Sequence, residues 1–171
     1  MSQNHVFMQQ AFAQAMRAFD QNEVPVGCVI VKEGRVIGRG YNQMETLKDP
    51  TAHAEILAIG AAATHLGDWR LDGCTLYATL EPCPMCAGAI LNSRISEVVY
   101  AAEDKRLGAC GSVLHLLNGR LINRSIPTTG GIMRDDALAL IQDFFKERRK
   151  FKKQAPPAYP ESLTPLSDPL N

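Results

Sequence analysis

Three side chains of this sequence have the types and the spacing needed to hold one metal ion. They are His53 and, later in the chain, Cys83 and Cys86. Residues three positions apart share one face of a helix, so both thiols can reach the same ion. Zinc accepts imidazole and thiolate ligands, and three protein ligands leave the fourth tetrahedral position open for water. We therefore predict one zinc per chain in a catalytic arrangement.

Glu55 is the fourth candidate, because it stands two residues after His53. On an ideal helix this separation is a rotation of about 200°, so the two side chains do not bind the same ion. Zinc acidifies a water molecule, and a carboxylate beside that water can carry its protons. We interpret Glu55 as the catalytic acid and base. The C-x-x-C pair alone would also fit a structural zinc site or a redox dithiol; the lack of a fourth ligand at suitable spacing favours catalysis.

H-x-E followed by P-C-x-x-C is the established signature of zinc-dependent nucleobase deaminases. Over about residues 6–153 the sequence resembles the bacterial tRNA-specific adenosine deaminases of the cytidine/deoxycytidylate deaminase superfamily. The segments that carry the resemblance are Glu23-Val24-Pro25-Val26-Gly27, Gly40-Tyr41-Asn42, Asp49-Pro50-Thr51-Ala52-His53-Ala54-Glu55, Thr79-Leu80-Glu81-Pro82-Cys83 and Met85-Cys86-Ala87-Gly88-Ala89.

This resemblance implies a reaction. Adenosine at the wobble position of a tRNA anticodon loop would be hydrolytically deaminated to inosine. Metal-activated water would attack C6 of adenine, and Glu55 would pass protons to N1 and to the departing amino group. The residues implied around the base are the Asn42 side chain, the Ala54 amide, an apolar wall near Val26, and the Leu80-Glu81 backbone at the leaving group.

The resemblance also implies contacts to the RNA outside the target base. Asp104 matches a loop that meets the neighbouring nucleotide, and Phe145 is our choice over Phe144 for stacking on an unpaired base. Arg106 and Arg124 stand where relatives usually carry Lys and His, so the sequence leaves the tRNA contacts there undefined.

A basic run near the C-terminus extends this expectation. Six cations have only Glu147 opposing them: Lys146, Arg148, Arg149, Lys150, Lys152 and Lys153. Charge alone would favour a solvated helix end. The resemblance favours phosphate contacts instead, with Arg148 and Arg149 as substrate-binding residues.

The pattern of apolar residues predicts an α/β protein. We expect helices over 6–19, 52–66 and 135–151, a further helix starting at Pro82, and one short helix within 104–118. Strands are expected over 26–31, 36–41, 74–79, 97–101 and 125–128, the first two forming a hairpin. Strands that alternate with helices after a hairpin favour one mixed sheet covered on both faces. The resemblance implies a cytidine-deaminase-like three-layer α/β/α sandwich with five strands.

Composition sets the remaining expectations. The chain has 171 residues, of which 46% are hydrophobic and 21% charged, and its net charge is zero. This fits one deaminase domain over 1–153, followed by a Pro-rich tail over 154–171 that we expect to be disordered. Cys28, Cys74 and Cys110 are predicted to be buried free thiols, as expected in a reducing compartment. We expect a cytoplasmic homodimer with no membrane segment and with a tRNA anticodon stem-loop as partner.

Two other functions compete with this one. A deaminase of free bases or nucleosides, such as cytosine or guanine, would use the same zinc site. A basic helix that carries an aromatic residue is superfluous for a free base and favours RNA. A non-catalytic, zinc-stabilised RNA-binding module conflicts with Glu55 and the open fourth position. The sequence does not indicate which tRNAs are modified.

Overall fold

The computed structural model describes residues 2–118 and 124–154. Five strands form one mixed sheet in the order β2-β1-β3-β4-β5. β1 (Gly27–Lys32) pairs antiparallel with β2 (Arg35–Tyr41) and with β3 (Thr75–Leu80), whereas β3, β4 (Glu97–Ala102) and β5 (Thr128–Thr129) run parallel. The predicted five-stranded mixed sheet is therefore confirmed.

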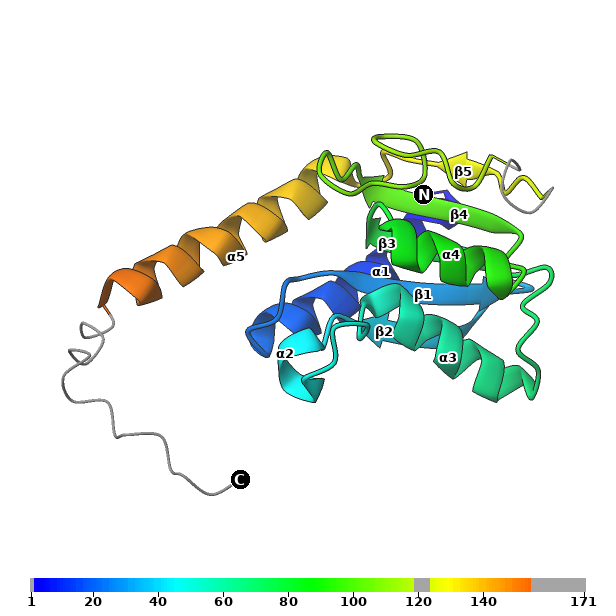
Figure 1. Ribbon diagram of the computed structural model, residues 1–171, viewed down its shortest axis with the longest axis horizontal. Coiled ribbons are helices and arrows are strands. Elements are labelled where there is room, and N and C mark those ends of the chain that lie inside the picture. Colours follow the sequence, from blue (N-terminus) through cyan, green and yellow to red (C-terminus); the bar gives the residue numbers. More distant parts are fainter. Residues whose placement is uncertain (1, 119–123, 155–171) are drawn as a thin grey trace, which may run out of the picture.

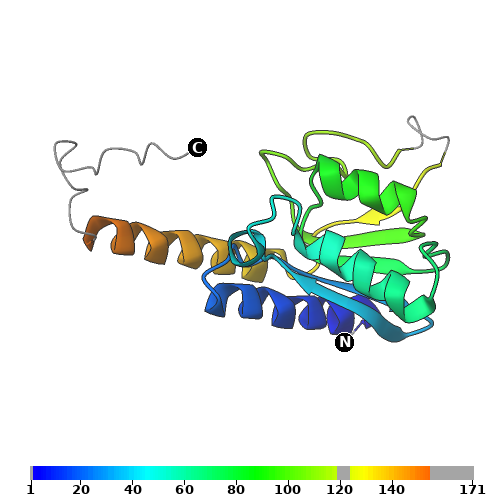
Figure 2. The same ribbon diagram turned by 60° about the horizontal axis from the view of Figure 1, so that its bottom comes forward.

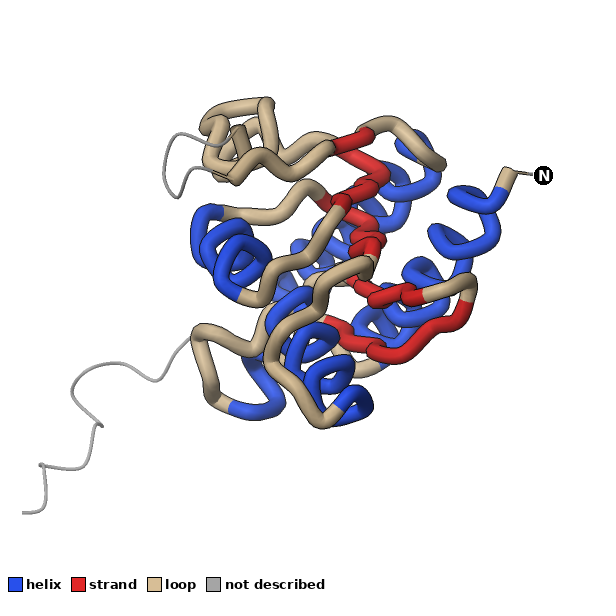
Figure 3. The backbone as a smooth tube through the Cα atoms, turned by 90° about the vertical axis from the view of Figure 1, so that its right-hand side faces the viewer, coloured by secondary structure: helices blue, strands red, loops and turns tan. Residues whose placement is uncertain are grey.

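Helices cover both faces of this sheet (Figures 2 and 3). α1 (Gln3–Asp20) and the beginning of α5 (Arg134–Gln154) pack on one face, and α3 (Ala54–Leu66) and α4 (Pro84–Asn92) pack on the other. A one-turn helix, α2 (Met44–Leu47), connects β2 to the segment before α3. The three-layer α/β/α sandwich is confirmed. Figure 1 shows that α5 continues beyond the edge of the sheet.

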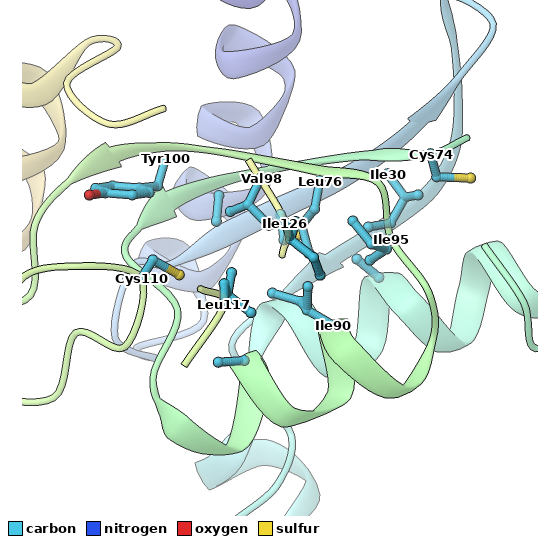
Figure 4. Packing of buried hydrophobic residues seen from close by; sticks show 14 of the residues in the cluster. Ile30, Cys74, Leu76, Ile90, Ile95, Val98, Tyr100, Cys110, Leu117 and Ile126 are labelled. Carbon is cyan, nitrogen blue, oxygen red and sulfur yellow. The ribbon is translucent and has the colours of Figure 1, made fainter. Parts of the chain in front are cut away.

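Alternation along the strands supplies the two cores, since successive strand residues face opposite sides. Leu76 and Val98 face the α3–α4 side, and Tyr77 and Val99 face α1. Figure 4 shows the first core, where Ile90 of α4 packs beneath the sheet. Cys28, Cys74 and Cys110 are buried free thiols, as predicted.

The predicted hairpin is formed by a tight turn between β1 and β2. Lys32 pairs with Arg35, and both central residues of the turn, Glu33 and Gly34, have positive φ angles of 49° and 74°. Two positive φ angles characterise the type I′ turn, whose twist matches that of a hairpin. β2 then passes very close to α3: a Cβ atom added at Gly40 would collide with the backbone oxygen of Ala54. Glycine in β2 thus lets the first turn of α3 approach the sheet.

Several predicted boundaries were wrong. The helix expected from residue 52 begins at Ala54, because the Asp49 carboxylate accepts hydrogen bonds from the backbone and hydroxyl of Thr51 and so holds a turn there. It ends at Leu66 as predicted, and the next residue, Gly67, adopts a left-handed conformation with φ of 66°. The last helix begins at Arg134 and reaches Gln154, slightly longer than expected.

Two further expectations after β4 also need correction. The strand predicted over 125–128 is reduced to Thr128–Thr129, and Ser125 makes only an isolated bridge to Asn118. The 104–118 segment contains turns and a bridge between Cys110 and His115 instead of a short helix. Local propensity failed here because distant side chains fix this loop, as shown below.

The predicted tail over 154–171 lies outside the described residues except for Gln154. Within the described ranges, none of the helices has the length and apolar character needed to cross a membrane.

Candidate active site

The three predicted metal ligands are brought together by the starts of two helices. His53 is the N-cap residue of α3 and Cys83 is the N-cap residue of α4; neither side chain caps its own helix. Cys86 lies one turn into α4 and is buried. Pro84 occupies the first helical position, where the missing N–H costs nothing. Both N-cap side chains are therefore free to face a shared ion.

The spacing of the ligand atoms fits zinc. The Nδ1 atom of His53 lies 3.6 Å from the Cys83 sulfur and 3.5 Å from the Cys86 sulfur. A tetrahedral zinc with Zn–S of about 2.3 Å and Zn–N of about 2.05 Å has N···S edges of about 3.6 Å. Among the described residues, these three form the one His/Cys/Asp/Glu group whose ligand atoms are close enough to hold a metal. The group can hold one ion.

The protonation of the ligands is tightly coupled when no metal is bound. A hydrogen bond from the Cys86 thiol, followed by one from His53, lowers the pKa of Cys83 to about 4. The hydrogen bond between Cys86 and Cys83, together with burial, raises the pKa of Cys86. The hydrogen bond between His53 and Cys83 raises the pKa of His53. Zinc binding must displace the protons on Cys86 and His53, so acid disfavours metal binding.

Glu55 lies beside the ligands without belonging to their set. Its side chain is 4% exposed, and burial raises the pKa of its carboxyl above the ordinary value. The carboxyl contacts the Cys86 thiol and its own backbone N–H. The rotation of about 200° expected for two residues of one helix does not apply here, because His53 is the N-cap residue and has an extended conformation. A buried carboxylate with a raised pKa next to a metal site can accept and return protons near neutral pH.

A cavity of about 650 Å³ opens beside His53, one of the three predicted metal ligands. Six predicted substrate residues line it: Val26, Asn42, Ala54, Leu80, Asp104 and Phe145. The N–H of Ala54 is one of the first amides of α3, which have no partner within the helix. Glu55 and His53 line the same cavity, so a ligand there would meet the metal and the proton carrier together.

Arg148 and Arg149 do not line that cavity. They line an adjoining one of about 330 Å³ together with Asn22, Glu23 and Phe144. Asn42 and Phe145 line both cavities, which connects the two arginines to the metal centre along one surface.

Glu81 does not line the larger cavity, and its side chain has a role that the sequence did not indicate. Its backbone N–H donates to the Ala102 oxygen, and its carboxylate, 2% exposed, accepts N–H bonds from Asp104, Cys110 and Ser112 at 2.9 to 3.1 Å. A Cβ atom at Gly108 would collide with this carboxylate. The Glu81 side chain therefore fixes the loop that carries Asp104. Sequence reasoning missed this role, because the partners lie more than twenty positions away.

Glu23 is the second buried carboxylate that sequence reasoning missed. Its side chain is 1% exposed and accepts hydrogen bonds from the Asn42 side chain and from the backbone of Glu45 and Thr46. The sequence signals are an acidic residue four positions before β1 and its place in the Glu23-Val24-Pro25-Val26-Gly27 segment, and neither distinguishes an exposed turn residue from a buried anchor.

The two phenylalanines of α5 divide as predicted. Phe144 is 4% exposed and packs edge-on against Phe19 of α1, while Phe145 is 42% exposed and lines both cavities. Arg148 stacks on Phe144 and donates to the Asn22 backbone oxygen at 3.2 Å. Arg148 thus also attaches α5 to the end of α1, whereas Arg149 is exposed.

The two atypical arginines lie in different places. Arg106 lines the larger cavity. Arg124 lines neither cavity and donates to the backbone oxygens of Arg94 and Ile95. An ion pair that was not predicted, between Glu103 and Arg134 at 3.0 Å, also borders the larger cavity and ties its loop to the start of α5.

Comparison with known proteins gives a consistent result. Residues 1–102 match the family model for the cytidine and deoxycytidylate deaminase zinc-binding region. The chain is 42% identical to the tRNA-specific adenosine deaminase of Bacillus subtilis (strain 168) over 155 residues, which covers 91% of this chain and 96% of that protein.

Solved structures of two kinds resemble the fold. One, from work on A-to-I editing by tRNA:A34 deaminases at the wobble position, has a TM-score of 0.76 and 39% identity, covering 79% of this chain and 98% of the other. Another, a guanine deaminase from Nitrosomonas europaea, has a TM-score of 0.72 and 26% identity, covering 82% and 83% respectively.

Proposed function

We propose that this chain, which belongs to the zinc-dependent cytidine and deoxycytidylate deaminase family, deaminates adenosine to inosine at the wobble position of tRNA anticodon loops. Its relatives include tRNA-specific adenosine deaminases. The observation that carries the proposal is the shared cavity. One space brings together the His53 and Glu55 side chains and Phe145 of the basic helix α5. A free base needs the first two, whereas the exposed aromatic residue and the cations suit an RNA strand.

Zinc, held by His53, Cys83 and Cys86, would supply a water molecule acidified to near neutral pH. Glu55 would take one proton from that water and deliver it to N1 of adenine as the water oxygen bonds to C6. It would then carry the remaining proton of that oxygen to the amino group, so that the C6–N bond breaks and ammonia leaves. Burial suits Glu55 to this exchange, since a raised pKa lets the carboxyl return its proton. Inosine and ammonia are the products, and Glu55 ends in its starting form.

Residues of the cavity wall would position the base. Val26 and Leu80 supply apolar surface, Asn42 offers an amide to the base edge, and the Ala54 N–H offers a donor beside the metal ligands. The Leu80-Glu81 backbone would lie at the leaving group. Each of these roles follows from the place of the residue together with the family motif.

RNA outside the target base would contact the cavity mouth and α5. Asp104 would meet the neighbouring nucleotide, Phe145 would stack on an unpaired base, and Arg148 and Arg149 would contact phosphates. A loop adenosine is the favoured target, because an unpaired base costs little to extrude.

We further propose a cytoplasmic homodimer whose deaminase domain covers 1–153, with 154–171 dispensable for the reaction. Exposed apolar side chains at Val113 and Leu114, 47% and 42% exposed, support a contact between two copies through the 104–118 loop. Sedimentation equilibrium of the purified chain would test the dimer.

The decisive experiment compares substrates for the zinc-loaded protein. We expect an anticodon stem-loop with adenosine at the wobble position to yield inosine, while free adenosine, cytidine, cytosine and guanine remain unchanged. Faster ammonia release from guanine or cytosine than from the hairpin would instead establish a free-base deaminase. Activity on the hairpin that survives Glu55→Ala would contradict the mechanism.

A further inference from the structure

The carboxylate of Glu23 is a buried anion with three hydrogen-bond donors around it. Oε2 accepts from Asn42 Nδ2 at 3.3 Å and from the Glu45 N–H at 3.2 Å, and Oε1 accepts from the Thr46 N–H at 2.6 Å. The side chain is 1% exposed, and Asn42 is 6% exposed. This acidic residue lies beside the substrate cavity, yet the chemistry proposed above does not use it.

The contact with Glu23 fixes the orientation of the Asn42 amide. A carboxylate only accepts hydrogen bonds, so the Asn42 atom that faces it must be the NH₂ group. The reverse orientation would bring the amide oxygen against a carboxylate oxygen and leave both without a donor. Asn42 therefore keeps its carbonyl oxygen and its second N–H for other partners, and its side chain lines the cavity.

Glu23 also holds α2. The N-cap residue of this helix, Gln43, makes no side-chain cap, and its second and third residues, Glu45 and Thr46, donate their N–H groups to Glu23. These are the positions that an N-cap side chain normally satisfies. A residue from the segment between α1 and β1 thus caps α2 from a distance, and it places Met44 at the edge of the cavity.

We propose that Glu23 is a positioning residue for the substrate base, acting through Asn42. Its carboxylate decides which atoms of the Asn42 amide face the base. Adenine presents a donor and an acceptor side by side, at its amino group and N7, and Asn is a common partner for this edge. Guanine presents two acceptors there, so an amide of fixed orientation helps to distinguish the two bases. This inference rests on the proposed adenosine deaminase activity.

The Glu23→Gln variant is the most direct test, because glutamine keeps the shape and provides one acceptor oxygen instead of two. If that oxygen stays with the Thr46 N–H, the new NH₂ group faces Asn42 and the Glu45 N–H, and the Asn42 amide must turn to offer its oxygen. If the oxygen instead faces Asn42 and Glu45, the Asn42 amide still exchanges a charged acceptor for a neutral one. NMR of the Asn42 side-chain amide, assigned by its loss in Asn42→Ala, reports this change in zinc-loaded protein without any substrate. We expect a clear shift of both amide protons. Unchanged signals would overturn the proposal, whatever the activity of the enzyme.

The second test measures kcat/KM on the adenosine hairpin and requires that the wild-type protein is active on it. Loss of a well-placed hydrogen bond should lower kcat/KM by about tenfold to a hundredfold in Glu23→Gln and in Asn42→Ala. If Glu23 acts through Asn42, the double variant should fall no further than about twofold below Asn42→Ala, since the effects of coupled residues do not multiply. Losses that multiply in the double variant would show an independent structural role.

Glu81→Gln is the matched control. It replaces another buried carboxylate, which lines neither cavity and whose N–H donors all belong to the 104–112 backbone. Its loss in kcat/KM should multiply with that of Asn42→Ala, and it should leave the Asn42 amide signals in place. If Glu81→Gln and Glu23→Gln are equally non-additive with Asn42→Ala, any disturbance of the protein around the cavity acts on Asn42. That result would overturn a specific role for Glu23.

If the wild-type protein is inactive on RNA hairpins, the proposed function is refuted. The NMR experiment would still test whether Glu23 sets the orientation of the Asn42 amide, because it uses no substrate.

Discussion

The metal centre and the basic helix α5 differ in burial: the first lies in the packed core, and most of the second lies on the surface. At the metal centre, two helix starts pack on the sheet, Cys86 and Glu55 are buried, and the ligand atoms already lie at the separations of a zinc tetrahedron. α5 contacts the sheet near its beginning and then passes the end of α1, held there by Phe144 and Arg148. The proposed chemistry thus lies in a buried core, and the proposed RNA contacts lie on an extended surface. Substitutions in the two regions should therefore affect different quantities.

Cys86→Ala should have the largest effect, because it removes a ligand from the core and a stabilising ion together. Bound zinc at a thousand times its Kd stabilises a fold by about 4 kcal/mol. Losing it lowers the melting temperature by about 8 to 16 °C for a chain of this size. We expect zinc content and turnover to fall to background, as measured by metal analysis and inosine formation. Stoichiometric zinc in this variant would contradict the ligand assignment.

Glu55→Ala should separate chemistry from metal binding within the same centre. Turnover should fall by at least about 10² to 10⁴-fold, the range of general acid–base catalysis. Zinc content should remain at one per chain, because the carboxylate lies outside the ligand set. Parallel metal analysis of this variant and Cys83→Ala provides the comparison. If Glu55→Ala loses zinc to the same extent as Cys83→Ala, Glu55 is a ligand and not the proton carrier.

Neutralising Arg148, Arg149, Lys152 and Lys153 together should weaken binding of the anticodon hairpin and leave zinc content unchanged. Each lost phosphate contact reduces the slope of log K against log salt by about 0.7 to 0.9. Titration of the hairpin at several salt concentrations measures this slope. An unaltered slope would mean that the basic run is a solvated helix end and that RNA is bound elsewhere.

Single substitutions sharpen this test on α5. Arg149→Ala should reduce the salt slope without lowering the melting temperature, because this side chain is exposed. Arg148→Ala should lower both, since Arg148 also bonds to Asn22 and stacks on Phe144. Lys146→Ala is the matched control: its side chain is exposed on the same helix and lines neither cavity. Equal effects of Lys146→Ala and Arg149→Ala would point to general charge instead of a defined contact.

Removal of residues 155–171 should have the smallest effect. A polar, Pro-rich segment has little apolar surface to bury, so we expect the free energy of unfolding to change by less than about 0.5 kcal/mol. Activity on the hairpin should be retained. Urea denaturation and inosine formation, compared with the full chain, check both quantities. A marked loss of hairpin affinity would assign the segment to RNA binding.

The sequence by itself indicated the group of His53, Cys83 and Cys86 that could hold a metal ion, the three-layer sandwich, and the choice of Phe145 over Phe144 as the residue outside the core. Zinc ligands are recognisable because few residue types bind the ion and because their spacing follows from local geometry. The main helices and strands are recognisable because apolar periodicity is a local property.

Only the tertiary structure decided the uses of Glu23 and Glu81, the close approach of β2 to α3 and the irregular 104–118 loop. Each depends on hydrogen bonds or close packing between residues that are distant in sequence. A buried carboxylate is stable only where several donors converge on it. That convergence is a property of the folded chain, and no local pattern around an acidic residue encodes it.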